Sequence, residues 1–165
     1  MPTPTTTSRP APARARHPFP LRWNDNDQYG HVNNTVYYEA MDTAVNAWMI
    51  ARGGLDPAGD VIGLCVASSC EFRESASYPE ALEVAIGVGK LGRTSLTWDL
   101  HILRASDDGA VTDGDGAAPI AVGRFTHVFV DATTRRPVPV PDGLRAAVAP
   151  LVLEPPALEP GPGAH

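Results

Sequence analysis

With 165 residues, the chain suits one domain that can bury a sizeable core. Its formal net charge of −6 and its scattered basic residues argue against nucleic acid as the main partner. No run approaches the ~18 apolar residues of a membrane span, so no membrane segment is predicted.

Two Pro-rich terminal segments are expected to be disordered tails, because they lack the apolar side chains that offset the entropy of ordering. They cover residues 1–16 and 153–165, which leaves 17–152 as the folded domain. The first segment has arginines but no apolar h-region, so we do not interpret it as a secretory signal. Cys65 and Cys70 lie in one predicted strand, too far apart to form a disulfide, which favours reduced thiols and a cytoplasmic location.

The first predicted elements are a short strand and a long helix. Residues 17–24 alternate between apolar and other side chains, and their two prolines are tolerated only at a sheet edge or a strand start. From 35 to 52 there is neither Pro nor Gly; Asn33 or Asn34 can cap the start, and Gly53 supplies the stop. This helix is apolar over most of its circumference, so other elements are expected to wrap it.

Four further strands are predicted after this helix from alternating apolar residues. They cover residues 61–74, 82–88, 96–102 and 120–130. The Asp- and Gly-rich segment 106–119 is interpreted as a solvated hairpin connection, since the Glu that would close a calcium loop is missing. A short helix is predicted at 143–151.

This order of elements predicts an α+β fold, with one antiparallel sheet of about five strands wrapped around one long central helix. A second copy can cover the edges of such a sheet.

The segment that joins the first strand to the long helix is much more polar than a connecting loop needs to be. Residues 22–34 read RWNDNDQYGHVNN and include two carboxylates, one imidazole, several amides and a glycine. This concentration of polar groups predicts that something is bound or catalysed at the turn. No Cys/His cluster shows metal-ligand spacing and no Gly-rich phosphate loop precedes a helix, so neither kind of site is predicted.

The string at 22–34, followed by VYYE at 36–39, strongly resembles the entry motif of the hotdog-fold acyl-CoA thioesterases of the 4-hydroxybenzoyl-CoA thioesterase type. A looser similarity extends over most of the predicted domain and includes FRE at 72–74 and LGRTS at 91–95. The resemblance implies a hotdog fold, a homodimer or homotetramer with active sites at the subunit interface, and an acyl-CoA substrate. It implies no metal or redox cofactor, and coenzyme A arrives as part of the substrate.

By this resemblance, the catalytic carboxylate is the second acid of the DxD pattern, Asp27, acting as general base on water or as a nucleophile that forms an anhydride. The backbone amide that polarises the thioester carbonyl maps to Asn34 at the helix N-terminus, where unpaired N–H groups and the positive dipole end lie. The named enzyme has an aromatic residue there, so aromatic acyl specificity does not carry over. The related plant acyl-carrier-protein thioesterases have an Asn where this chain has Tyr29, so only Asp27 and His31 of their Asp/Asn/His arrangement are present.

Each residue of the turn also has a structural alternative. Asp27 can be a turn former that bonds its own backbone, and His31 can tune Asp27, hold the substrate or bond the turn. Gly30 is expected at a positive φ or at a point of close approach. Asn33 either ties the turn or caps the helix. Together with Tyr29, Gly30 and Asn33 are assigned to the substrate-binding side of the site.

Other candidates lie outside the core of the motif. Asp25 is expected to structure the turn or to pair with Arg22. Glu39 on the helix is the second candidate for the catalytic carboxylate, because another branch of hotdog thioesterases uses a helix carboxylate; its alternative is a solvated or interface position. Three residues at the start of a later strand are expected to contact the phosphates or the pantetheine arm of coenzyme A, with a plain hairpin turn as the alternative: Arg93, Thr94 and Ser95.

These patterns predict a cytoplasmic, homo-oligomeric acyl-CoA thioesterase that uses Asp27. One rival is a hotdog enzyme of another reaction, either an acyl-carrier-protein thioesterase or a dehydratase. The DxD ahead of HVNN argues against a dehydratase, which normally pairs a His with an acid from the partner helix. The other rival is a non-catalytic protein that binds acyl thioesters, since fold alone does not establish function.

Overall fold

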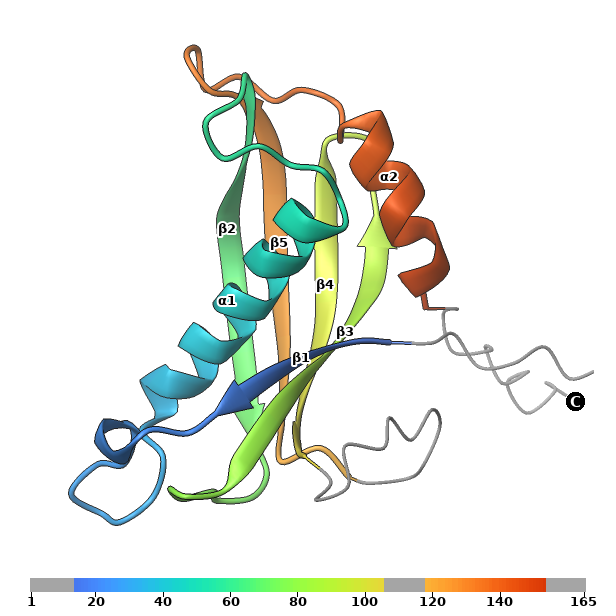
Figure 1. The fold of residues 1–165 in the computed structure, drawn as a ribbon. Helices are drawn as coiled ribbons and strands as arrows, with labels where there is room; N and C mark the ends of the chain where they lie inside the picture. Colours follow the sequence, from blue (N-terminus) through green and yellow to red (C-terminus); the bar gives the residue numbers. More distant parts are fainter. Residues whose placement is uncertain (1–13, 106–117, 154–165) are drawn as a thin grey trace, which may run out of the picture.

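The computed structural model describes residues 14–105 and 118–153 (Figure 1). Five strands form one antiparallel sheet in the order β1-β3-β4-β5-β2. The strands are β1 (Ala15–Pro20), β2 (Val61–Phe72), β3 (Ala81–Leu91), β4 (Ser95–Arg104) and β5 (Ala121–Asp131). The helices are α1 (Asn34–Ala51) and α2 (Asp142–Val148), with short 3-10 turns η1 (Trp23–Asp25) and η2 (Ala149–Leu151). The α+β layout with a five-stranded antiparallel sheet is therefore confirmed.

Helix α1 lies across one face of the sheet (Figure 1). Its N-terminus is capped by Asn33, whose side-chain oxygen accepts a hydrogen bond from the Thr35 N–H at 3.0 Å. Its C-terminus is followed by Gly54, which has a φ of +67° that other residues rarely adopt. The face toward the sheet buries seven residues: Val36, Tyr37, Ala40, Met41, Ala44, Val45 and Met49.

The sheet face under α1 carries apolar residues of β3 and β4 at alternating positions. Val84 lies opposite Ile102 and Ile86 opposite Leu100 in the β3–β4 register, so these side chains share one face. The second helix, α2, lies beside the β3–β4 hairpin, where the Arg145 guanidinium donates to the Gly92 carbonyl at 2.7 Å. The helical layer therefore contains α2 as well as α1.

The two sheet edges differ in composition. The β1 edge strand has six residues and contains two prolines, whereas the β2 edge strand has 12 residues and no proline. Prolines and short length protect an edge from pairing with other strands. Most of β2 beyond its first residues is exposed, so β2 is the edge of this sheet that remains open to pairing.

The predicted first strand has the wrong bounds. β1 starts at Ala15, which pairs with Ile86 of β3. Arg16 also forms an ion pair of 2.6 Å with Glu83, so Ala15 and Arg16 belong to the sheet and not to a tail. The strand ends at Pro20, and the alternation that continued to Trp23 was misleading, since Trp23 is 79% exposed in η1.

The helix predicted at 143–151 is also corrected, because α2 ends at Val148 and Pro150 lies in the 3-10 turn that follows. Expectations for residues 1–13, 106–117 and 154–165 lie outside the described residues. Within the described ranges, no helix is both long and apolar enough to cross a bilayer.

Candidate active site

The polar turn before α1 is closed by its own backbone. The Asp27 N–H donates to the His31 carbonyl at 3.0 Å, and the Gly30 N–H donates to the Asp27 carbonyl at 3.2 Å. Gly30 has a φ of +85°, so the expected positive φ is confirmed. A side chain at this position would strain the turn, which explains why a glycine stands there.

Asp25 has a structural role in this turn. It is 1% exposed, and its carboxylate accepts hydrogen bonds from the Arg22 N–H at 2.6 Å and from the Arg22 guanidinium at 2.9 Å. Burial by itself would raise the pKa of Asp25, but the hydrogen bonds and charge of Arg22 outweigh it and lower the pKa. The predicted pairing with Arg22 is therefore confirmed.

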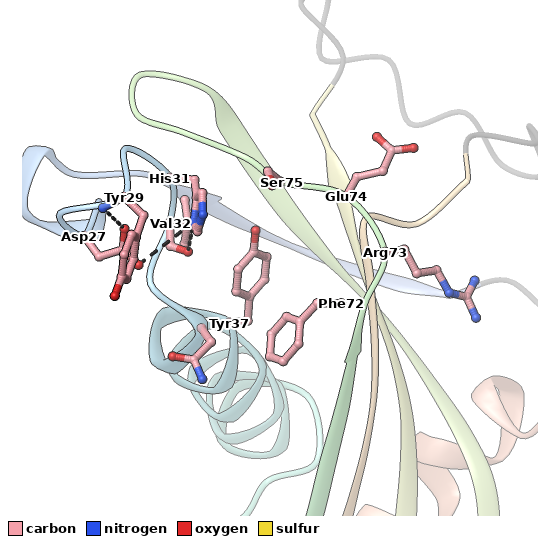
Figure 2. A pocket seen from close by; sticks show the side chains of 10 residues that line it. Asp27, Tyr29, His31, Val32, Tyr37, Phe72, Arg73, Glu74 and Ser75 are labelled. Atoms are coloured by element: carbon pink, nitrogen blue, oxygen red, sulfur yellow. Dashed lines mark hydrogen bonds and ion pairs between the residues drawn. The ribbon is translucent and has the colours of Figure 1, made fainter.

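A cavity of about 410 Å³ opens beside the turn (Figure 2). It is bounded by the turn itself, by the start of α1 and by the C-terminal end of β2 with the loop that follows. Its lining residues are Asp27, Tyr29, His31, Val32, Asn34, Tyr37, Phe72, Arg73, Glu74 and Ser75. The volume is within the range of about 300–1,000 Å³ that small-molecule sites occupy.

The two oxygens of Asp27 have different surroundings. Oδ1 accepts a hydrogen bond from the Tyr29 N–H at 2.8 Å, which is the turn-forming contact expected for this residue type. Oδ2 lies 4.0 Å from His31 Nδ1, too far for a direct hydrogen bond but within reach of one bridging molecule. The side chain is 21% exposed. One oxygen therefore holds the turn while the other is available to the cavity.

The first N–H of α1 is available as well. Asn33 uses its side chain to cap the Thr35 N–H, and its carbonyl accepts from the Val36 N–H at 2.9 Å. The Asn34 N–H has no hydrogen-bond acceptor among the residues that the structure describes. Because Asn34 lines the cavity at the positive end of the helix dipole, this N–H is suited to binding an anionic oxygen.

The opposite side of the cavity is aromatic. Tyr37 and Phe72 contact each other edge to face with their ring centroids 5.3 Å apart. Tyr38 lies 6.4 Å from Phe72 and 6.1 Å from Phe125, centroid to centroid, so the aromatic contacts continue from α1 to β5. Burial raises the pKa of Tyr37, which keeps its phenol neutral. The cavity thus combines a polar wall at the turn with an apolar wall on α1 and β2.

The sequence from residue 21 to residue 148 matches the model of the thioesterase-like superfamily. The chain belongs to this superfamily. Thioester hydrolysis is therefore its reaction class, and the resemblance to hotdog-fold thioesterases is confirmed. No curated protein matches the chain.

Solved structures support the family assignment. The PA5185 protein of Pseudomonas aeruginosa strain PAO1 is 41% identical, with a TM-score of 0.77 over 88% of this chain and 97% of that one. Two structures at 19% identity share the fold. They are a 1,4-dihydroxy-2-naphthoyl-CoA thioesterase from Synechocystis (TM-score 0.67, covering 81% of this chain and 93% of that one) and the gentisyl-coenzyme A thioesterase BH1999 (TM-score 0.66, covering 82% and 100%).

The structure brings together part of the residue set predicted for this thioesterase. Asp27, Tyr29, His31 and Asn34 line the cavity, while Gly30 and Asn33 shape the turn beside it. Their roles in binding or catalysis stay predictions. Sequence reasoning missed the aromatic and charged lining from α1 and the end of β2, although the spacing of three residues between Asn34 and Tyr37 places both on neighbouring turns of one helix.

Two groups of predicted site residues lie elsewhere in this chain. Glu39 is outside the cavity, 54% exposed, and lies 3.5 Å from the Arg22 guanidinium. The segment 93–95 is at the opposite end of the sheet from Phe72. Ser95 pairs with Val128, seven positions along β5 from the partner of Phe72, so they are about 23 Å apart along the strands. Within one chain, the 93–95 segment does not contribute to the cavity.

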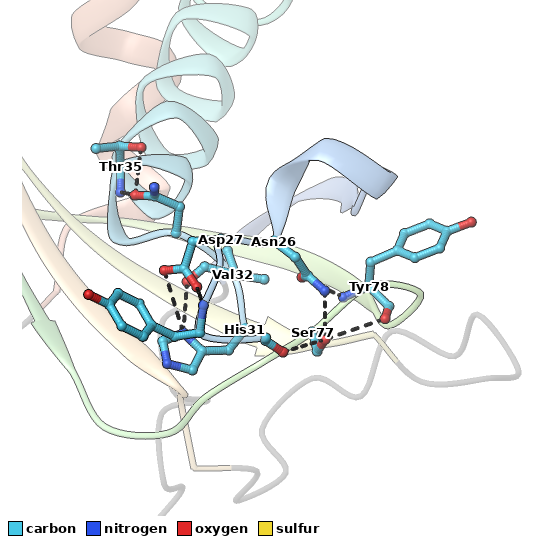
Figure 3. Close-up of polar contacts among 10 residues, drawn as sticks. Asn26, Asp27, His31, Val32, Thr35, Ser77 and Tyr78 are labelled. Carbon is cyan, nitrogen blue, oxygen red and sulfur yellow. Dashed lines mark hydrogen bonds and ion pairs between the residues drawn. The ribbon is translucent and has the colours of Figure 1, made fainter.

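Asn26 is a positioning residue that sequence reasoning did not identify. Its side-chain amide donates to Ser77 Oγ at 2.9 Å, and its side-chain oxygen accepts from the Tyr78 N–H at 3.0 Å (Figure 3). Ser77 Oγ in turn donates to the Gly30 carbonyl at 3.1 Å. These contacts fasten the Asp27 turn to the β2–β3 loop, more than 40 residues away in sequence.

Within the described part of the chain, no group of three or more potential metal ligands is found.

Proposed function

We propose that this thioesterase hydrolyses an acyl-CoA to a free carboxylic acid and coenzyme A. The observation that carries the proposal is that Asp27, His31 and Asn34 line one cavity, and that the Asn34 N–H has no acceptor among the described residues. Thioester hydrolysis needs these features: a group that activates water or attacks the carbonyl, and a donor for the negative charge that develops on the carbonyl oxygen.

The Asn34 N–H is proposed to bind the thioester oxygen. It is the first N–H of α1 and lies at the positive end of the helix dipole. Negative charge develops on this oxygen when the carbonyl carbon becomes tetrahedral, so the contact strengthens in the transition state. A single donor of this kind contributes a factor of about 10²–10³ to the rate.

Asp27 is proposed to supply the base or the nucleophile through Oδ2. As a base, it takes a proton from water while the water oxygen attacks the carbonyl carbon; the intermediate then expels the coenzyme A sulfur, which takes up a proton. As a nucleophile, Oδ2 forms an anhydride and releases coenzyme A, and water then hydrolyses the anhydride. His31, 4.0 Å from Oδ2, is placed to hold the attacking water in either route.

A second copy at the β2 edge is proposed to complete the site, and α1 is proposed to be the central helix of a hotdog arrangement in that homodimer. The open β2 edge supports this pairing. If two β2 strands pair antiparallel about their middle, residues 93–95 of the partner subunit lie three strand spacings, about 14 Å, from Phe72. Coenzyme A can contact them there. Two such dimers can form a homotetramer.

A cytoplasmic location is proposed as well, because the thiols of Cys65 and Cys70 are free.

The test is thiol release from a panel of acyl-CoAs by the wild type and by Asp27→Asn. The Asn side chain keeps an oxygen for the Tyr29 N–H, so the turn is preserved while the carboxylate is lost. The matched control is Asp56→Asn, because Asp56 forms the same kind of turn contact with the Ala58 N–H at 2.9 Å and is outside the cavity.

We expect Asp27→Asn to lower kcat by at least about 10²-fold and Asp56→Asn to leave it unchanged, with equal melting temperatures. Full activity of Asp27→Asn would show that Asp27 is structural. A wild type that cleaves acyl carrier proteins but no acyl-CoA would replace the proposal with the carrier-protein thioesterase. A wild type that binds acyl-CoA without cleaving it would favour a binding protein.

A further inference from the structure

A second layer of side chains lies behind the aromatic residues that line the cavity. Tyr37 and Phe72 line the cavity. Four residues further along α1 is Met41, and two residues back along β2 is Cys70, both about 6 Å deeper in the molecule. Side chains at these spacings point the same way as Tyr37 and Phe72. Met41 and Cys70 therefore form the next layer between helix and strand.

Met41 is fully buried in this layer. It is 0% exposed, and its thioether lies directly on the backbone of Gly123, the residue opposite Cys70 in the β2–β5 register. A Cβ at Gly123 would collide with the Met41 sulfur and lie 3.1 Å from the Ser69 carbonyl oxygen. The absence of a side chain at Gly123 is what allows Met41 to occupy the space between α1 and β5.

The same layer is apolar. Burial raises the pKa of Cys70 to about 11, so its thiol is neutral. Beyond Met41 along α1, the face toward the sheet consists of Ala44, Val45 and Met49, all 0% exposed. An acyl chain that enters past Tyr37 therefore meets packed side chains after one helical turn.

We propose that the acyl group lies against Tyr37 and Phe72 and ends at Met41, which restricts the site to compact acyl groups and makes Met41 the residue that sets their maximum size. This inference rests on the proposed acyl-CoA hydrolysis. Phe72 is still 46% exposed although it contacts two tyrosines, so part of its ring is available to substrate.

The test compares kcat/KM for butanoyl-, octanoyl-, dodecanoyl- and hexadecanoyl-CoA among the wild type and two truncations. Met41→Ala removes the proposed wall. Met49→Ala is the matched control, since Met49 is also a methionine of α1 with 0% exposure but lies two turns further from the cavity. Met41→Leu keeps the side-chain volume and should keep the wild-type profile. If Met41→Ala does not fold, Met41→Val provides a milder truncation.

The wild type is expected to lose at least about tenfold in kcat/KM between octanoyl- and hexadecanoyl-CoA, because pocket contacts discriminate methylene groups by about 10–200-fold. Met41→Ala should raise the dodecanoyl-to-octanoyl ratio by about tenfold, whereas Met49→Ala should leave this ratio unchanged. Equal activity of the wild type on all chain lengths, or equal profiles for Met41→Ala and Met49→Ala, would overturn the inference while thioester hydrolysis stands. A wild type that cleaves none of the four would overturn this inference, whereas only inactivity on the whole acyl-CoA panel would overturn the proposed function.

Discussion

Replacement of Asn26 by Ala should loosen the Asp27 turn from the β2–β3 loop. The change removes the hydrogen bond to Ser77 Oγ at 2.9 Å and the one from the Tyr78 N–H at 3.0 Å. A hydrogen bond contributes about 0.5–1.5 kcal/mol net, so the two together predict a loss of about 1–3 kcal/mol in the free energy of unfolding. Ser77 also bonds the Gly30 carbonyl, so the loss extends to the turn that holds Asp27.

The change should also lower activity. A displacement of about 1 Å at a catalytic group can cost about 10²-fold in rate. The Val32 N–H still donates to the Ala76 carbonyl at 2.8 Å, so the turn should shift without detaching. We therefore expect Asn26→Ala to lower kcat/KM by about 10–100-fold under conditions where the protein stays folded. Asn26→Asp keeps the acceptor for the Tyr78 N–H and should be intermediate in both measurements.

Urea unfolding and acyl-CoA hydrolysis measure the two effects. The matched control is Asn24→Ala, because Asn24 lies in the same segment, is exposed, and makes no side-chain hydrogen bond with any residue that the structure describes. If Asn26→Ala and Asn24→Ala are indistinguishable in both assays, the contacts of Asn26 do not position the turn.

Two further predictions concern stability. The hydrogen bond from His101 and the charge and hydrogen bonds of Arg14 lower the pKa of Asp99 to about 2 against the opposing effect of burial. A lowered folded-state pKa stabilises the protein above the ordinary pKa of Asp, by about 2 kcal/mol here, and this contribution disappears as the pH falls from about 4 through 2. Unfolding free energies measured over this range should fall more steeply for the wild type than for Asp99→Asn, and parallel curves would contradict the assignment. Gly123→Ala should lower the free energy of unfolding by about 1–3 kcal/mol, because the new methyl group collides with Met41. Gly89→Ala, whose Cβ would make only ordinary contacts at 3.7 Å or more, is the control and should not lower the free energy of unfolding measured in urea.

Local sequence determined the elements whose signals lie close together in the chain. The helix predicted at 35–52 is observed at Asn34–Ala51, since its cap at Asn33 and its glycine stop act within a few residues of its ends. The pairing of Asp25 with Arg22 and the positive φ of Gly30 were predictable for the same reason. The polar turn was identified from its composition, and it is the part of the cavity that contains Asp27 and His31.

Only the tertiary structure decided which distant segments meet. Periodicity shows which face of a strand is apolar but not which strands are neighbours or in what register they pair. For that reason Ala15 and Arg16 were assigned to a tail, although Arg16 pairs with Glu83 of β3. The same limit concealed the aromatic contact between Tyr37 on α1 and Phe72 on β2, which exists because these two elements converge there. Periodicity also does not show that the 93–95 segment lies about 23 Å along the strands from the cavity within one chain. This distance follows from strand length and register, which place the two ends of a sheet apart.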